Sequence, residues 1–263
     1  MSYDLSAMSH TGSFFAGTFA VGTVVGFLSG LLGKGGSAVT TPALQLFLNV
    51  PDYLALASPL PAALPTLLSA AWAYRGKDLV DWRVVRLSVL WGALATLAGS
   101  FLSVRVGGHA LMVLTALMVL GLGVSLLFEG GAPRPEPRVP SAGAIAAIAV
   151  AVGGLSGLLA NTGGILFGPL FIRALGLPPK RALACSLVVS AALAVPGVGA
   201  HMYLGHIDWG IVAALSLAAI PSSYMGARLA LSLRDKTLLR VYGVLLALFG
   251  LYDLWRVVLV YNR

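Results

Sequence analysis

Apolar residues run through this chain in long blocks that short polar gaps separate. Most blocks are about twenty residues long, which is the length a helix needs to cross the ~30 Å hydrocarbon core of a bilayer. Because helices satisfy their own backbone hydrogen bonds in lipid, the blocks predict an all-α polytopic membrane protein. The long blocks are Phe14–Leu32, Tyr53–Tyr74, Val84–Val104, Ala110–Phe128, Ala142–Leu159, Ala182–Leu204, Ile211–Leu233 and Leu238–Val260.

Two shorter blocks, Ala38–Leu48 and Ile165–Leu175, interrupt this pattern. With about eleven residues each they are too short to span a bilayer, so we expect a broken or re-entrant helix at each. Each short block follows a glycine-rich turn, Gly33–Ser37 in the first case and Ala160–Gly164 in the second. These two turns are the feature around which the other helices are expected to be arranged.

The composition fits a chain whose main solvent is lipid. Hydrophobic residues make up 58% of it and charged residues 10%, whereas soluble domains are about 25% charged. The net charge of +8 raises the possibility of nucleic acid as a partner. However, the basic residues lie in the short gaps between apolar blocks, as in cytoplasmic loops of membrane proteins, so we expect a lipid bilayer and no nucleic acid. The single Cys185 excludes a disulfide framework and a multi-cysteine metal site.

A constant spacing relates the two parts of the chain. Pro42 and Pro169, one in each short block, are 127 positions apart (169 − 42). The same offset pairs Gly30 with Gly157, Pro51 with Pro178, Asp81-Trp82 with Asp208-Trp209, and Gly99 with Gly226. Proline, aspartate and tryptophan rarely match by chance in this composition, so the spacing predicts an internal duplication. Repeat one is residues 1–128 (half one), a proline-rich cytoplasmic linker is 129–140, and repeat two is 141–263 (half two), together one transmembrane domain.

Corresponding loops of the two halves carry opposite charge patterns. The loop after the third block of half one is basic, but its counterpart Gly205–Gly210 holds no Lys or Arg. The loop before the third block reverses this, because only half two is basic there. By the positive-inside rule the halves are therefore predicted to be inserted upside down relative to each other, with both termini outside. Inverted repeats with broken helices are typical of secondary transporters, whose site lies near the midplane.

The two glycine turns are candidate anion sites. A helix that starts inside the membrane presents unpaired N–H groups and the positive end of its dipole, and glycine allows a ligand to approach the backbone closely. The alternative is that these glycines only permit tight helix packing. The candidate substrate-binding residues of the turns are Gly35, Gly36, Ser37, Asn161, Thr162, Gly163 and Gly164.

Lys34 lies inside the first turn and changes the chemistry expected there. At membrane depth a lysine is costly and is usually functional, and its positive charge favours an anionic substrate. In the alternative interpretation the turn is shallow and the Lys34 side chain reaches water. Asn161 stands at the equivalent position of half two, so the predicted site is asymmetric.

The third block of each half, counting the short one, begins with a second pair of candidates. These are Ser58, followed by Pro59, in half one and Cys185-Ser186 in half two. Because proline frees backbone groups and adds a kink, the start of the half-one block is expected to be irregular. The hydroxyls and the thiol are predicted either to complete a polar substrate pocket or to act as small packing residues.

The residues quoted above resemble a known family. The repeated pattern GxLSGLLxxxG…P, at Gly26–Pro42 and Gly153–Pro169, is similar to that of the sulfite exporter TauE/SafE family, also called the 4-toluene sulfonate uptake permeases. The resemblance covers about residues 14–260 and implies a transporter of small sulfur-containing anions or organosulfonates in a prokaryotic inner membrane. Here lysine replaces the usual apolar residue of the first turn.

The leading hypothesis is a secondary transporter of a small anion, such as sulfite or an organosulfonate, that works by alternating access. The alternatives are an anion channel of the same architecture and a non-catalytic membrane subunit. No catalytic or metal-ligand cluster is seen, so neither an enzyme nor a cofactor is expected. A homodimer is the default expectation for the assembly.

Overall fold

The structure is a computed structural model that describes residues 12–33, 37–48, 50–102, 108–128, 140–158, 162–203 and 207–261. Within these ranges every regular element is an α-helix, which confirms the all-α part of the predicted fold class. Lys34, Gly35, Gly36 and Asn161 lie outside the described residues. The helices are α1 (Gly12–Leu32), α2 (Ser37–Leu48), α3 (Asp52–Ala57), α4 (Pro59–Ala73), α5 (Trp82–Leu102), α6 (Gly108–Phe128), α7 (Ala142–Leu158), α8 (Gly164–Arg173), α9 (Pro179–Tyr203), α10 (Trp209–Ser232) and α11 (Asp235–Tyr261).

The helix boundaries follow the predicted blocks closely, with the irregularity expected near Ser58. There the third block divides into α3 and α4, because Pro59 has no N–H group to continue the hydrogen-bond ladder. The backbone at Ser58 stays in the right-handed helical region, with φ −61° and ψ −31°. The division is therefore a local break in hydrogen bonding that leaves the two helices joined without a loop.

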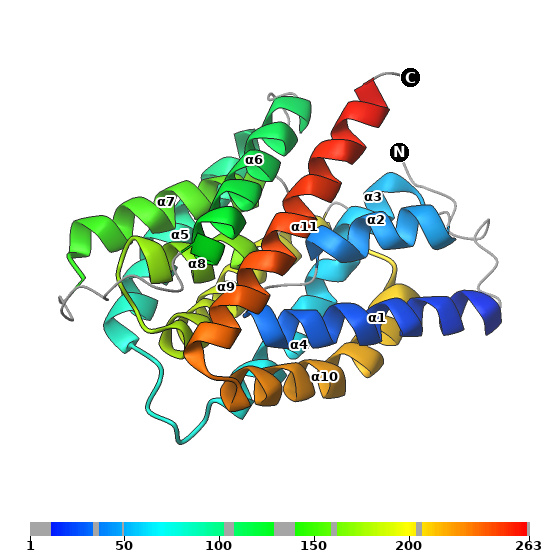
Figure 1. Ribbon diagram of the computed structural model, residues 1–263. Coiled ribbons are helices and arrows are strands. Elements are labelled where there is room, and N and C mark those ends of the chain that lie inside the picture. The colour runs from blue at the N-terminus through cyan, green and yellow to red at the C-terminus, as the bar shows by residue number, and fades with distance from the viewer. Residues whose placement is uncertain are drawn as a thin grey trace.

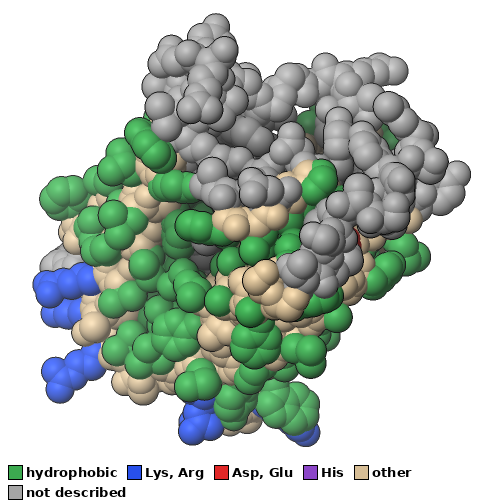
Figure 2. Space-filling view, turned by 90° about the vertical axis from the view of Figure 1, so that its right-hand side faces the viewer, with side chains coloured by type: hydrophobic (Ala, Val, Ile, Leu, Met, Phe, Trp, Pro, Cys, Tyr) green, Lys and Arg blue, Asp and Glu red, His purple; other side chains and the backbone are tan. Residues whose placement is uncertain are grey.

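The outer surface of the described chain is apolar, as lipid requires. Four helices are long and apolar enough to cross a membrane: Gly12–Leu32, Trp82–Leu102, Pro179–Gly199 and Trp209–Ser232. Large side chains such as Phe101 stay exposed, and in Figure 2 hydrophobic side chains cover most of the described face while Lys and Arg gather near its edges. These features describe a multi-pass membrane protein.

Helices from opposite halves pack together. The most extensive helix pairs are α1 with α10, α5 with α7, and α6 with α11 (Figure 1). In addition, α4 packs on α10 and on α9, and α9 packs on α5. Each half therefore buries its apolar surface largely against the other half, and neither half forms a core by itself.

Glycine makes the two main cross-half pairs possible, and it does so in the same way in both. A Cβ atom at Gly26 would lie 2.5 Å from the Cα of Ala219, and one at Gly153 would lie 2.9 Å from the Cα of Gly92. Further along the pairs, a Cβ at Gly30 would meet the carbonyl oxygen of Ser223, and one at Gly157 would meet that of Thr96. Each of these contacts has its counterpart 127 positions away. Such close approach of two helix backbones is possible only without side chains.

Candidate functional site

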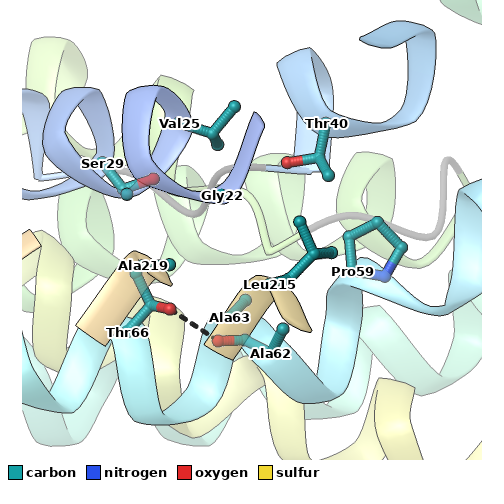
Figure 3. Close-up of a pocket in the computed structure, with 11 residues that line it drawn as sticks. Gly22, Val25, Ser29, Thr40, Pro59, Ala62, Ala63, Thr66, Leu215 and Ala219 are labelled. Atoms are coloured by element: carbon teal, nitrogen blue, oxygen red, sulfur yellow. Dashed lines mark hydrogen bonds between the residues drawn. The ribbon is translucent and has the colours of Figure 1, made fainter. Parts of the chain in front are cut away.

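A small cavity of about 20 Å³ lies between α1, α2, α4 and α10 (Figure 3). This volume is enough for about one water-sized sphere. The walls are mostly small apolar residues, namely Gly22, Val25, Gly26, Pro59, Ala62, Ala63, Leu215 and Ala219. Three hydroxyl-bearing residues from three different helices complete it: Ser29 of α1, Thr40 of α2 and Thr66 of α4.

The cavity lies beside the starts of two helices, α2 and α4. Gly22 and Gly26 let α1 pack closely on α10, and Pro59 marks the start of α4. Thr40 is in the first turn of the short helix α2, which follows the first glycine turn in the sequence. The cavity is therefore next to the start of α2, which follows the first glycine turn in the sequence.

Ser29 is the polar group in this cavity that has no partner. Its side chain is fully buried, and its Oγ atom makes no hydrogen bond. The Thr66 hydroxyl, in contrast, donates a 2.6 Å hydrogen bond to the carbonyl oxygen of Ala62 (Figure 3). A buried hydroxyl without a partner costs about 1–3 kcal/mol, so Ser29 is suited to bind a polar ligand or water in the cavity.

A hydrogen bond joins the start of the first glycine turn to the other half of the chain. Gly33 ends α1 in the left-handed region, with φ 62°. Its carbonyl oxygen accepts a 2.8 Å hydrogen bond from the hydroxyl of Ser186 on α9. The predicted site residue Ser186 thus lies beside the first turn. The side chain of Ser37, the first residue of α2, lies outside the described part.

The described part of the second glycine turn, Thr162–Gly164, is buried in the protein. Thr162 is 1% exposed, and Gly163 is left-handed, with φ 66° and ψ −8°. Gly163 precedes α8, and no side chain caps the start of this helix. The backbone N–H groups of Leu166 and Phe167 donate to the Gly163 carbonyl oxygen, which closes the first turn of α8. Thr162, Gly163 and Gly164 therefore lie together at a helix start, as predicted.

Ser58 and Cys185 form hydrogen bonds outside the cavity. The Ser58 hydroxyl accepts a 2.9 Å hydrogen bond from the backbone N–H of Asp208, and the Cys185 sulfur accepts one of 3.2 Å from the N–H of Asp81. Both pairs join opposite halves, and they are related by the 127-residue offset. Neither Ser58 nor Cys185 lines the cavity. In this conformation the two side chains position the starts of α10 and α5.

The two aspartates of these pairs are helix N-caps. Asp208 Oδ1 accepts from the N–H groups of Gly210 and Ile211, at 2.8 and 3.1 Å. Asp81 Oδ1 accepts from the N–H groups of Arg83 and Val84, at 3.0 and 3.2 Å. Such caps satisfy N–H groups that a helix start leaves without a carbonyl partner. The matching Asp-Trp pairs in the sequence are thus explained by the starts of two equivalent helices.

We expect Ser58→Ala to destabilise the protein by about 1–3 kcal/mol, because it removes a buried hydroxyl that accepts a hydrogen bond from the backbone N–H of Asp208. Thermal unfolding of the detergent-purified protein measures this effect. Ser232→Ala is the matched control, since the Ser232 hydroxyl is exposed and bonds only within its own helix. Equal melting temperatures for the two variants would contradict the assigned role of Ser58.

Ser29 and Thr40 were not among the candidates from the sequence. A signal was present for Ser29, because the duplicated motif keeps a serine at both Ser29 and Ser156. No comparable signal marks Thr40, whose counterpart is Phe167. Within the described residues, no group of three or more His, Cys, Asp or Glu side chains could hold a metal ion.

Comparison with known proteins places these features in a family. The sequence model described as "Sulfite exporter TauE/SafE" matches residues 18–252, which is most of the chain. The chain belongs to the sulfite exporter TauE/SafE family. This family member is therefore a membrane transporter and not an enzyme.

Several bacterial proteins are similar to this family member over nearly their whole length. A "Probable membrane transporter protein" of Xylella fastidiosa (strain 9a5c) is 28% identical over 249 residues, covering 91% of this chain and 94% of the relative. The "Probable membrane transporter protein YunE" of Bacillus subtilis (strain 168) is 26% identical over 260 residues, covering 88% and 93%. No solved structure matches this chain.

Proposed function

We propose that this protein is a secondary transporter of a small oxyanion of sulfur, with sulfite as the first candidate, and that the anion binds at the cavity beside the first glycine turn. The observation that carries the proposal is the hydroxyl of Ser29, which is buried, has no hydrogen-bond partner and lines the cavity. An oxyanion accepts hydrogen bonds, so it satisfies this donor.

The surroundings of the cavity suit a negative charge. The start of α2 contributes backbone N–H groups and the positive end of a helix dipole. Lys34, which precedes α2 in the sequence, supplies a positive charge to the same turn. In half two the start of α8, with Thr162 and Gly163, is proposed to bind the anion at a later stage of transport.

The size of the cavity bears on the choice of substrate. A space of about 20 Å³ holds little more than one water-sized sphere, so a larger anion requires the surrounding helices to separate. A compact inorganic oxyanion demands far less separation than an aromatic sulfonate. We therefore propose sulfite, and not an arene sulfonate, as the better fit to this conformation.

Transport is proposed to proceed by alternating access between two inverted repeats. The support comes from opposite loop charges in the sequence and from cross-half helix pairs that repeat the same contacts at the 127-residue offset. In this scheme residues 1–128 and 141–263 rock against each other, both termini lie outside and the linker is cytoplasmic. The cross-half hydrogen bonds at Ser58 and Cys185 lie where such rocking would act.

The test is thermal stabilisation of the purified protein by a panel of anions, namely sulfite, sulfate, chloride and 4-toluene sulfonate. A ligand at about 100 times its dissociation constant stabilises the folded state by about 2.7 kcal/mol. We expect sulfite to raise the melting temperature most and 4-toluene sulfonate least.

Ser29→Ala extends the same measurement to the site. A hydrogen bond to a charged group contributes about 1.5–3 kcal/mol, so we expect the variant to bind sulfite at least about tenfold more weakly. Ser125→Ala is the control, because Ser125 lies on α6 and its hydroxyl bonds to the Leu122 carbonyl oxygen. If Ser29→Ala and wild type bind every anion equally, the cavity is not the site. Single-channel currents in place of saturable counterflow would contradict a transporter.

A further inference from the structure

Half two contains positions equivalent to the cavity walls, and larger side chains occupy several of them. The residues 127 positions after the cavity walls lie on α7, α8 and α9, and those 127 positions before them lie on α5. At four of these positions a larger side chain replaces a smaller one: Phe167 for Thr40, Leu193 for Thr66, Val189 for Ala62 and Ala149 for Gly22. Phe167 is fully buried, its ring packs on that of Phe171, and a Cβ at Gly163 would lie 3.2 Å from it. Phe167 thus stands where half one has a small polar residue and open space.

The equivalent positions in half two include two hydroxyl groups without hydrogen-bond partners. Ser88 of α5 and Ser190 of α9 are fully buried, and neither hydroxyl has a hydrogen-bond partner. Their equivalents in half one are the apolar cavity walls Leu215 and Ala63. Half two therefore has two buried hydroxyls without hydrogen-bond partners at positions where half one has apolar side chains. Burying a hydroxyl without a partner destabilises the fold, so packing alone does not explain these serines.

A third hydroxyl belongs to the same region. Ser156 of α7 is the counterpart of Ser29, and its Oγ donates a 2.7 Å hydrogen bond to the Val152 carbonyl oxygen. A Cβ at Gly163 would meet this oxygen, so Ser156 lies directly against the left-handed turn that starts α8. The same turn is in contact with Phe167, as described above. Phe167 and the hydroxyl of Ser156 therefore flank one glycine.

We propose that half two holds a second binding site for a small oxyanion, lined by Ser88, Ser190 and Ser156 and closed by Phe167 in this conformation. The inference rests on the proposed function, because it assigns the same class of ligand to the second half. When the Phe167 ring moves away, the two unpartnered hydroxyls become donors to the anion. The halves thus have unequal roles: half one presents an open cavity while an aromatic side chain closes its counterpart.

The test is the number of sulfite ions bound per chain by purified Phe167→Thr, measured by equilibrium binding of ³⁵S-sulfite. Threonine is the residue that half one has at the equivalent position. We expect the wild type to bind one sulfite and Phe167→Thr to bind two. Adding Ser88→Ala and Ser190→Ala to Phe167→Thr should return the number to one. Phe171→Thr is the matched control, since Phe171 is equally buried on the same helix, and it should bind one.

The outcomes separate this inference from the proposed function. One sulfite in both wild type and Phe167→Thr overturns the second site and leaves the first intact. No binding to wild type but one sulfite on Phe167→Thr supports the second site and overturns the first. No binding to either protein overturns both.

A second variant covers the case in which Phe167→Thr does not fold. Ser88→Ala with Ser190→Ala in the wild-type background removes only unpartnered hydroxyls, so folding is expected to be unaffected or improved. The second site predicts sulfite counterflow about tenfold slower in this variant, with an unchanged dissociation constant at the first site. Unchanged counterflow would overturn the second site.

Discussion

Gly157→Val is expected to prevent α5 and α7 from packing and to leave little folded protein. A side chain at Gly157 would run into the carbonyl oxygen of Thr96 and the backbone nitrogen of Ser100. Overpacking against movable side chains costs about 1–3 kcal/mol, and here the obstacle is helix backbone, so the loss should be at the upper end or beyond. The measurement is the fraction of detergent-solubilised protein that elutes as a single peak, together with its apparent melting temperature.

The same helix supplies a control. Gly154 lies on α7 only three residues from Gly157, but a Cβ there would meet nothing within 4 Å. Gly154→Val should therefore cost little stability, because valine is a better helix former than glycine. Gly30→Val, at the equivalent position of the α1–α10 pair, should be as damaging as Gly157→Val. Similar stability of Gly154→Val and Gly157→Val would show that close backbone packing is not what holds the halves together.

Gly163→Ala is expected to reduce sulfite counterflow to below about a tenth of the wild-type rate. Gly163 is left-handed, and an L-residue in that conformation costs about 1–2 kcal/mol. In addition, the new methyl group, which lies just before the start of α8, would contact the hydroxyl of Ser156 on α7. The turn must then rearrange, which displaces the backbone N–H groups proposed to bind the anion. Counterflow in proteoliposomes, normalised to the amount of inserted protein, measures the loss.

Gly176→Ala separates backbone strain from the loss of the turn. Gly176 is left-handed too, with φ 68°, but a Cβ there would meet nothing within 4 Å. This variant pays the conformational cost without a contact at the proposed site, and it should keep most of its transport rate. Full transport by Gly163→Ala would exclude the second glycine turn from the transport path.

The helices were predictable because the bilayer imposes their length and their polarity. Blocks such as Phe14–Leu32 and Ile211–Leu233 reappear in α1 and α10 with small shifts at the ends. The break before α4 was also expected, since Pro59 lacks the N–H group that a continuous helix needs. In each case the deciding interaction lies within a few residues along the chain.

The partners of Ser58 and Cys185 were not predictable in the same way. Both were candidates for a substrate pocket, yet each accepts a backbone N–H from the other half, at Asp208 and Asp81. The offset linked Ser58 with Cys185 and Asp81 with Asp208 as equivalents. It contained no information that Ser58 meets Asp208 or that Cys185 meets Asp81. Contacts across more than a hundred residues depend on how the helices are arranged in space.

Hydropathy, proline and the repeated motif were thus enough to establish a helical membrane protein, its family resemblance and the two glycine turns. Local hydrogen bonding and the cost of polar backbone in lipid act along the sequence, so they can be read from it. The pairing of α1 with α10 and of α5 with α7 required the folded chain, because it depends on which backbones approach at Gly30 and Gly157. The cavity at Ser29 required it as well, since four separate helices supply its walls.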